Sequence, residues 1–357
     1  MKHLELFAGI GGFRRALDLL EKDKIMDFEC VGYSEIDANA VKTYTINFKP
    51  KKKEIALGDI VSFTANAENI MSLPDFDLLT GGFPCQTFSM MGKQAGFAED
   101  RGQMFFRIVD ILNVKRPKYV LLENVKNLYT HDNKRTFARI ISELEGLGYN
   151  VVSNIFNTAD YHLPQKRSRV LIFATTTELP VGFQERFTPA SVKDAFDSHY
   201  LNSSVTKADS VLEILEKEVP DKYLLSERIK PTLLSDGSAN FKSNSEINQL
   251  VARTLTASMH KMHRACQDNY YSLDFIQSNG KINPAKTLTK EQLAKIPIRK
   301  ITPQEAFCLQ GFPASFATKA QKGGVSDGAL YKQAGNAVSI NTIYAVLYYL
   351  IKNQIIK

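Results

Sequence analysis

Residues 2–20 have the sequence KHLELFAGIGGFRRALDLL, which predicts a strand, a tight glycine turn and a helix in that order. Lys2 to Phe7 is a short strand-like run, and apolar residues recur at helical spacing from Phe13 to Leu20. Glycine lets the backbone approach a ligand closely, and the free N–H groups at the start of a helix favour an anion such as a phosphate or a carboxylate. The spacing differs from Gly-x-Gly-x-x-Gly, so the dinucleotide fingerprint is not met, and an ordinary glycine turn is the alternative.

The alternation of strand-like and helix-like segments continues through the first half of the chain. A second helix is expected at Ala38–Phe48, and the further strand-like runs are residues 28–34, 54–57, 76–80, 119–122, 150–156 and 169–174. This rhythm predicts an α/β fold in which helices cover both faces of a mostly parallel, Rossmann-like sheet. Ligands of such sheets bind beyond the carboxyl ends of the strands, so residues that follow strands are the first candidates for a site.

Two acidic residues follow successive strands. Glu35 ends the second strand, where a carboxylate can accept hydrogen bonds from ribose hydroxyls, and Asp59 ends the third, where it can accept one from an adenine amino group. Taken singly, each acid is more often a helix cap or a surface charge. Together with the glycine turn they favour a ligand that contains adenosine.

The pattern becomes irregular after about residue 177 and returns near residue 299. The residues between these points form short mixed runs and polar patches, which indicate a second domain. Thr302 to Leu309 then has the sequence of a capped helix, and Ser339 to Lys352 that of a long amphipathic helix. We therefore expect a catalytic domain of residues 1–177, completed by residues 299–357, and a smaller irregular domain of residues 178–298.

The composition is that of a folded and modestly basic protein. Of its 357 residues 44% are hydrophobic and 23% charged, which argues against global disorder, and the net charge of +7 gives weak support to a polyanionic partner. The four cysteines are scattered, so we expect neither a disulfide framework nor a cysteine-rich zinc site. Because the start lacks a signal-peptide pattern and the apolar stretch Ala337–Ile351 is too short to span a bilayer, we expect a cytoplasmic protein without membrane contact.

Cys85 is the strongest candidate for a nucleophile. A free cysteine is usually an inert small hydrophobe, but this one follows a buried strand, two glycines and a proline, where a thiol is expected to be exposed and activated as a thiolate. Glu123 ends another buried strand and is placed to act as a general acid. Its alternative is a structural carboxylate paired with an arginine, and the two roles are compatible.

Two arginines precede the last strand of the first domain. On an extended chain Arg167 and Arg169 point to the same face. One guanidinium is then expected to hold Glu123 and a substrate carbonyl, and the other a phosphate. The alternative is a basic strand edge.

Taken in order, these segments resemble the motifs of the bacterial DNA (cytosine-5) methyltransferases of type II restriction–modification systems. The matching segments lie within residues 4–175 and 299–350, and their order and spacing together are highly specific. They are Leu6-Phe7-Ala8-Gly9-Ile10-Gly11-Gly12, Gly82-Phe83-Pro84-Cys85-Gln86, Glu123-Asn124-Val125, Gln165-Lys166-Arg167-Ser168-Arg169, Arg299 to Glu305 with Gly311-Phe312-Pro313, and Gly335-Asn336-Ala337-Val338. Ile36 stands where the family often has a tryptophan and Glu5 where aspartate is more usual, and neither departure touches the chemistry.

The resemblance implies a covalent mechanism with S-adenosylmethionine (SAM) as the methyl donor and S-adenosylhomocysteine as its product. Cys85 would add to carbon 6 of a cytosine flipped out of the duplex, Glu123 would assist at ring nitrogen 3, and Arg169 would contact Glu123 and the base. Arg167 completes the expected catalytic set. The residues expected to bind SAM are Phe7, Ala8, Gly9, Gly11, Gly12, Glu35, Ile36, Asp59, Ile60, Pro84, Asn336 and Ala337.

The irregular middle segment falls where this family carries its target-recognition domain. Nine basic and three acidic residues lie between Arg253 and Lys300, an excess that suits contact with DNA phosphates. We expect the loop from Gln86 to about Gln103 to close over the flipped base, with Met91 or a neighbour wedged into the vacated space. The residues expected to contact DNA are Phe83, Gln86, Ser89, Met91, Asn124, Val125, Arg253, Arg264 and Gly335, with Gln267 as a further candidate.

Two other functions remain open at this point. A transfer-RNA cytosine-5 methyltransferase ranks second. Those enzymes carry Pro-Pro-Cys at the nucleophile and lack a long recognition domain, whereas this chain has Phe83-Pro84-Cys85 and a long middle segment. A catalytically silent DNA-binding regulator is disfavoured by the complete catalytic set. We expect a monomer that has no obligate protein partner and is paired in function, not physically, with a cognate restriction endonuclease. His260, His263 and Cys266 recur every three residues, but a fourth zinc ligand is missing, so no metal is expected.

Overall fold

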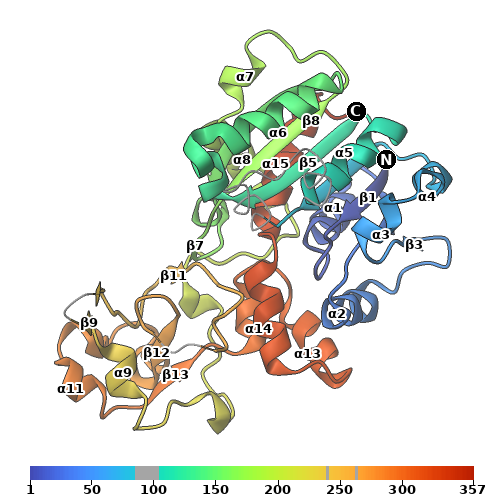
Figure 1. Ribbon diagram of the computed structural model, residues 1–357. Coiled ribbons are helices and arrows are strands. Elements are labelled where there is room, and N and C mark those ends of the chain that lie inside the picture. Colours follow the sequence, from blue (N-terminus) through green and yellow to red (C-terminus); the bar gives the residue numbers. More distant parts are fainter. Residues whose placement is uncertain (85–103, 239–240, 262–263) are drawn as a thin grey trace. The chain divides into compact units, whose positions relative to one another are not determined.

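A seven-stranded sheet in the order β3-β2-β1-β4-β5-β8-β6 organises the first half of the chain (Figure 1). The computed structural model describes residues 1–84, 104–238, 241–261 and 264–357. The sheet strands are β1 (Lys2–Leu6), β2 (Glu29–Tyr33), β3 (Ile55–Ala56), β4 (Leu78–Gly82), β5 (Tyr119–Val125), β6 (Asn150–Asn157) and β8 (Ser168–Thr175). The predicted α/β fold with a mostly parallel sheet is therefore confirmed.

The chain divides into two compact units. Unit 1 comprises Met1–Asn157, Ser168–Val205 and Thr342–Lys357, and unit 2 comprises Thr158–Arg167 and Thr206–Asn341. Unit 1 contains the sheet and most of the last helix. Its helices are α1 (Gly12–Lys22), α2 (Ala38–Phe48), α3 (Ile60–Thr64), α4 (Ala67–Ser72), α5 (Met104–Lys115), α6 (Arg135–Gly146), α7 (Phe183–Arg186), α8 (Pro189–Tyr200) and α15 (Ile340–Lys352), with 3-10 turns at Lys126–Tyr129 and His131–Lys134.

The strand β8 is the one reversal among the strands of this sheet. It pairs antiparallel with β5 on one side and with β6 on the other, whereas β3, β2, β1, β4 and β5 all run parallel. The register places Val125, at the end of β5, opposite Arg169, near the start of β8. The start of β8 therefore lies at the edge of the sheet where the parallel strands end.

Side chains alternate between the two faces of the sheet. One face packs against α3, α4, α5 and α6. The buried residues of this layer include Leu79, Val120, Leu122, Val170 and Ile172 from the strands and Ile60, Ile70, Ile108 and Ile140 from the helices. Glu123 and Arg169 alternate with these strand residues and so project from the opposite face. In Figure 1, α6 and α15 lie on opposite sides of the sheet.

Unit 2 is built from short elements joined by irregular segments. Its small apolar core includes Leu233, Leu234, Ile247, Tyr270 and Ile298. Three two-stranded sheets occur in the described part of this unit: β7 with β11, β9 with β10, and β12 with β13. Its elements are β7 (Gln165–Lys166), α9 (Lys230–Leu234), β9 (Gly237–Ser238), β10 (Phe241–Lys242), β11 (Ala252–Arg253), β12 (Tyr270–Ser272), α10 (Leu273–Gln277), α11 (Lys290–Leu293), β13 (Ile298–Lys300), α12 (Pro303–Cys308), α13 (Ala314–Lys322) and α14 (Asp327–Asn336), with 3-10 turns at Thr158–Tyr161, Val211–Glu213, Asp221–Tyr223 and Pro284–Lys286.

A buried ion pair joins β13 to α12. The Arg299 guanidinium donates to both carboxylate oxygens of Glu305 at 2.7 and 2.8 Å, and it also donates to the carbonyl oxygen of Glu216 at 2.8 Å. Glu305 also accepts from the backbone N–H of Thr302, whose hydroxyl accepts in return from the N–H of Glu305. This capping box confirms the helix start predicted at Thr302. The ion pair is buried, so loss of either partner would leave an uncompensated charge.

The two units divide the chain at positions that differ from the expected domain boundaries. Residues 178–205 belong to unit 1, because Asn154 of β6 bonds the carbonyl of Phe187 and Phe196 of α8 packs on Tyr344 of α15. Residues 299–341 belong to unit 2, where the Arg299–Glu305 pair ties them to Glu216. Only residues 342–357 of the C-terminal segment return to unit 1.

One segment of the described chain, Asp327–Lys352, is long and apolar enough to cross a membrane by length and composition. Within its most apolar window 83% is buried inside the protein, as happens with core helices. The segment is also interrupted between α14 and α15.

The glycine at position 335 allows an unusually close approach of two segments of unit 2. A Cβ atom added to Gly335 in α14 would lie 2.3 Å from the carbonyl carbon of Thr256 and 2.3 Å from the nitrogen of Ala257. Both are backbone atoms, which cannot move aside as the end of a flexible side chain can. Gly335, which we expected to contact DNA, thus has a packing role that accounts for its small size.

We predict that Gly335→Ala lowers the free energy of unfolding by about 1–3 kcal/mol, because the backbone at residues 256–257 must shift to relieve the clash. Urea unfolding followed by circular dichroism measures the change. Gly146→Ala in α6 is the matched control, since a Cβ there meets nothing within 4 Å. Alanine in an exposed helix gains up to about 1 kcal/mol over glycine, so the control should not lose stability. Equal stability of both variants would contradict the prediction.

Candidate active site

Hydrogen bonds tie together the loops that follow β1, β2 and β3. The N–H of Ala8 donates to the carbonyl of Ser34 at 2.9 Å, and the N–H of Gly9 donates to the Glu35 carboxylate at 2.8 Å. The Ser34 hydroxyl donates to the carbonyl of Gly58 at 2.8 Å. Three segments far apart in sequence therefore form one assembly at the carboxyl ends of neighbouring parallel strands, the place where such sheets bind ligands.

The Glu35 carboxylate organises this assembly. One of its oxygens accepts from Gly9, and the other accepts from the N–H groups of Ile36 and Asp37, each at 2.8 Å. A carboxylate has about four acceptor positions, so one remains for a ligand hydroxyl. Ile36, directly after it, leaves 73% of its surface exposed, which is high for a large apolar side chain. Glu35, the predicted ribose-binding residue, and Ile36, a member of the expected SAM set, are thus adjacent and at least partly exposed.

Two glycines of the turn after β1, Gly9 and Gly11, have different surroundings. Gly9 has φ of +55°, and a Cβ added there would meet nothing within 4 Å, so the residue faces open space. Gly11 has φ of +82°, and a Cβ there would lie 2.2 Å from the ring of Phe48. Gly11 is therefore needed for packing under α2, whereas Gly9 borders space that a ligand can use. Phe7 also has a positive φ, +53°, which is strained for a bulky residue.

Asp59 caps the helix α3. Its carboxylate accepts from the N–H groups of Val61 and Ser62 at 3.1 and 3.3 Å and from the Ser62 hydroxyl at 2.7 Å. The bonds from Ser62 and Val61 lower the pKa of this exposed carboxyl below its usual value. Ile60, which follows, is buried in the core, so only its backbone could reach a ligand. The cap and the predicted adenine contact are compatible, because the carboxylate remains exposed.

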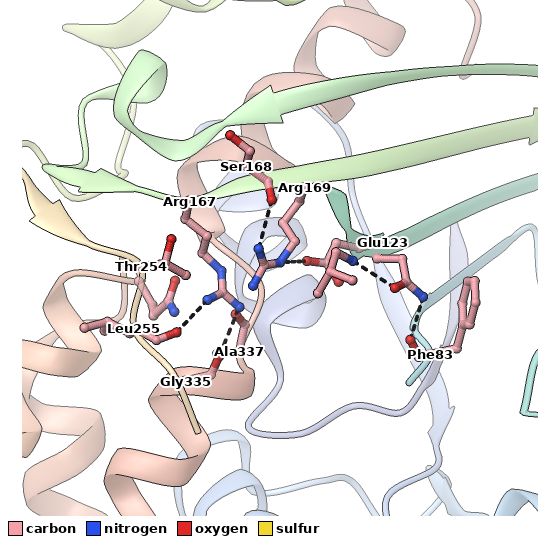
Figure 2. A network of polar contacts seen from close by, with 12 residues as sticks. Phe83, Glu123, Arg167, Ser168, Arg169, Thr254, Leu255, Gly335 and Ala337 are labelled. Carbon is pink, nitrogen blue, oxygen red and sulfur yellow. Dashed lines mark hydrogen bonds and ion pairs between the residues drawn. The ribbon is translucent and has the colours of Figure 1, made fainter. Parts of the chain in front are cut away.

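Glu123 and Arg169 form an ion pair at the end of β5 (Figure 2). The Nε atom of Arg169 lies 2.9 Å from Oε1 of Glu123, and only 16% and 11% of the two side chains are exposed. The same guanidinium donates to the carbonyl of Ser168 at 2.9 Å. The nearly buried Glu123 carboxylate is thus paired with the Arg169 guanidinium.

Asn124 connects this pair to the end of β4. Its side-chain amide donates to the carbonyl of Phe83 at 2.8 Å, and its oxygen accepts from the N–H of Val125 (Figure 2). Phe83 is buried and its ring packs on Phe105 at 5.6 Å between centroids. Because Gly82 pairs with Glu123 in the sheet, the segment that leads to residue 85 starts beside the ion pair.

Comparison with known proteins agrees with this geometry. A family model described as C-5 cytosine-specific DNA methylase matches residues 1–352. The chain belongs to this family. Among its curated relatives, the type II methyltransferase M1.ScrFI of Lactococcus lactis subsp. cremoris is 38% identical over 97% of this chain and 76% of the relative. M.DsaV of Dactylococcopsis salina is 35% identical over 97% of this chain and 84% of the relative, and M.NlaX of Neisseria lactamica is 34% identical over 97% and 94%.

Solved structures share the fold of this methylase. The Dnmt2 methyltransferase of S. pombe aligns with a TM-score of 0.73 and 20% identity over 99% of both chains. The methyltransferase EhMeth of Entamoeba histolytica aligns with a TM-score of 0.68 and 19% identity over 99% of this chain and 98% of that one. At this identity the likeness concerns the fold, which is that of the SAM-dependent methyltransferases.

In this C-5 cytosine-specific methylase, Arg167 has different partners from those expected. Its buried guanidinium donates to the carbonyls of Leu255, Gly335 and Ala337 at 2.8–3.1 Å, all within unit 2 (Figure 2). Arg167 lies between two strands, since β7 ends at Lys166 and β8 begins at Ser168. Its contacts join the backbone at Leu255 to the backbone at Gly335 and Ala337 within unit 2.

The remaining predicted residues fall into two groups. Cys85, Gln86, Ser89 and Met91, together with the rest of the expected loop to Gln103, lie outside the described residues. Of the residues expected to bind SAM, Asn336 and Ala337 lie at the end of α14 in unit 2, and the others lie in unit 1. Arg253 and Arg264, which we expect to contact DNA, also lie in unit 2. Pro84 is exposed at the end of the described segment, and Gly12 is the first residue of α1.

Sequence reasoning passed over Ser34 and Lys166. Ser34 joins two loops through its backbone and its hydroxyl, and a small polar residue before Glu35 gives no local signal of this. Lys166 lies opposite Arg253 because β7 pairs in parallel with β11. The Thr254 hydroxyl, 88 residues later in the chain than Lys166, donates to the carbonyl of Lys166. The Gln165–Arg169 motif marked its neighbourhood, but its partner across the two strands could not be deduced from spacing.

Replacing Asp59 separates its capping role from its proposed contact with adenine. Serine caps helices about as well as aspartate, so Asp59→Ser should change the free energy of unfolding by less than about 0.5 kcal/mol. The SAM affinity measured by calorimetry should fall roughly tenfold, because a hydrogen bond to a charged group is lost. Asn66→Ser, at the cap of α4, is the control and should change neither quantity. An unchanged affinity in Asp59→Ser would leave Asp59 as a cap alone.

Proposed function

We propose that this methylase transfers a methyl group from SAM to carbon 5 of a cytosine at a specific site in duplex DNA. The observation that carries the proposal is the nearly buried Glu123–Arg169 pair. Glu123 pairs with Gly82, the last residue of β4, and Cys85 follows Gly82 by three residues in the chain. The named relatives are type II methyltransferases, which supports a role in protecting DNA from a cognate restriction endonuclease.

Carbon 5 of cytosine is too weak a nucleophile to attack a methyl sulfonium directly. In the proposed mechanism the Cys85 thiolate forms a bond to carbon 6, while Glu123 provides a proton at ring nitrogen 3 and so offsets the charge that develops. Arg169 orients Glu123 through the contact at 2.9 Å and is positioned to donate to the base carbonyl. Once carbon 5 carries the transferred methyl group, loss of its proton to a base allows the thiolate to leave, and return of the ring nitrogen 3 proton to Glu123 restores the neutral aromatic ring.

The residues of unit 1 fit a SAM molecule. SAM supplies a methyl group activated by a positive sulfur. We assign the remaining acceptor position of Glu35 to the ribose hydroxyls, Asp59 to the adenine amino group, and the exposed side chain of Ile36 to the face of the adenine. The open space beside Gly9 is suited to the methionine part of the molecule. Phe7, Ala8, Gly12, Ile60 and Pro84 complete the proposed set in unit 1.

We assign DNA recognition to unit 2. Arg253 and Arg264 belong to it, and both are candidates for contacts with phosphates or base edges. The transfer-RNA alternative is weaker, because the matching family is one of DNA methylases and covers residues 1–352. We further propose that the enzyme acts as a monomer in the cytoplasm, without an obligate protein partner and without a membrane.

A methyl-transfer assay tests the proposal. Wild type and Cys85→Ser are incubated with labelled SAM and either unmethylated duplex DNA or transfer RNA, and the nucleosides are identified by mass after digestion. We expect 5-methyldeoxycytidine from DNA with wild type and none with the variant. Label in transfer RNA, or a methyl group on an exocyclic amine, would show that the substrate or the chemistry is misassigned.

Glu123→Gln tests the acid. The change keeps the shape of the side chain and a hydrogen bond to Arg169 but removes the proton donor. We expect kcat to fall by about 100-fold or more, the usual contribution of general acid–base catalysis, with SAM affinity unchanged. Single-turnover methylation and calorimetry measure the two quantities. Glu145→Gln, at an exposed position of α6, controls for the lost charge. A kcat within a few-fold of wild type would remove Glu123 from the mechanism.

A further inference from the structure

An open groove of about 570 Å³ lies on unit 2. Its described lining includes two cations and four groups that can donate hydrogen bonds through hydroxyl or amide groups, and none of the lining residues is acidic. They are Lys166, Arg253, Thr254, Thr256, Ser258, Cys266 and Gln267. A groove lined in this way has the chemistry of a site for an anion.

The two cations of the groove are placed together by the backbone. Lys166 and Arg253 are partners in the parallel pairing of β7 with β11, so their side chains project to the same face. The pairing is reinforced on both strands. The Thr254 hydroxyl donates to the carbonyl of Lys166, and the Asn269 side chain bonds both the N–H and the carbonyl of Arg253, at 2.8 and 3.1 Å. Like charges held side by side repel unless an anion joins them.

Glu246 supplies part of the missing negative charge. Its carboxylate lies 3.5 Å from the Arg253 guanidinium, and it is held in place by Asn244 at 2.7 Å and Gln249 at 2.6 Å. About half of the Glu246 side chain is exposed, and 26% of the Arg253 side chain is exposed. The pair is therefore accessible to a competing anion and is weak enough to be exchanged.

We propose that the groove between Lys166 and Arg253 binds a backbone phosphate of duplex DNA, and that Glu246 occupies Arg253 until the phosphate displaces it. This inference rests on the proposed function, because it takes duplex DNA as the substrate. The Thr254, Thr256 and Ser258 hydroxyls supply neutral donors beside the cations, which suits a phosphate with several acceptor oxygens.

The exchange has a consequence for the dependence of binding on salt. DNA binding releases about one counterion for each phosphate that a protein cation neutralises. Because the Glu246 carboxylate stays beside the cation, the pair neutralises less of the phosphate charge, so fewer of the cations condensed on the DNA are released. Removal of the Glu246 charge should therefore both tighten binding and steepen its dependence on salt.

The test measures binding of a fluorescent mixed-sequence duplex by anisotropy over a series of NaCl concentrations. Glu246→Gln should tighten binding about two- to fivefold, the range spanned by exposed ion pairs, and should steepen the slope of log Kd against log salt by up to about 0.9. Lys166→Met should weaken binding and make the slope shallower by about 0.9. In an Arg253→Met background, Glu246→Gln should have a much smaller effect, because the cation for which Glu246 and the phosphate compete is gone.

Glu218→Gln is the matched control, since Glu218 is an exposed acid of unit 2 that does not line the groove. It should change Kd by less than Glu246→Gln does, and circular dichroism checks that every variant is folded. The inference is overturned if wild type binds and methylates duplex DNA but Glu246→Gln does not bind more tightly. It is also overturned if the effect persists without Arg253, which would indicate a diffuse charge effect. A wild type that neither binds nor methylates duplex DNA would overturn the proposed function itself.

Discussion

The antiparallel pairing of β8 with β5 is the constraint on which the candidate active site depends. Residues that follow β1, β2, β3, β4 and β5 meet at one edge of the sheet because these strands are parallel. Arg169 is the second residue of β8, and only the reversal of this strand places it opposite Val125 at that same edge. In a parallel arrangement Arg169 would lie at the other edge, about 20 Å away for a strand of this length. Glu123 would then be a nearly buried carboxylate without its arginine.

The part of this edge that we propose binds SAM is ordered by the protein itself. The loops after β1, β2 and β3 are joined by hydrogen bonds from Ala8, Gly9 and Ser34, and the Glu35 carboxylate accepts from three backbone N–H groups. The strained backbone of Phe7 is maintained within this assembly. A site already held in its binding shape spends less of the interaction energy on ordering loops when the ligand arrives.

Two arginines separated by one residue illustrate how polar contacts serve different purposes in the two units. Arg169 turns toward Glu123 in unit 1, where the pair serves chemistry in the proposed mechanism. Arg167 is buried in unit 2 and satisfies the carbonyls of Leu255, Gly335 and Ala337. Unit 2 has a small apolar core and short elements, so such contacts, like the Arg299–Glu305 pair, define its shape. The groove at Arg253 shows the opposite design, in which an exposed ion pair is available for exchange.

The sequence by itself determined the α/β fold, the family and the helix start at Thr302. Each of these depends on sequence patterns: alternating segments, ordered motifs, and capping residues three positions apart. Tertiary structure alone decided that Arg167 donates to the carbonyls of Leu255 and Gly335. It also decided that Gly335 must be small because Thr256 approaches it, and that Lys166 pairs with Arg253 across two strands. It also moved the boundaries, placing residues 178–205 with the sheet and residues 299–341 with unit 2. These outcomes depend on contacts between segments some 30 to 170 residues apart, and no periodicity or spacing in the sequence specifies which distant backbone a side chain will meet.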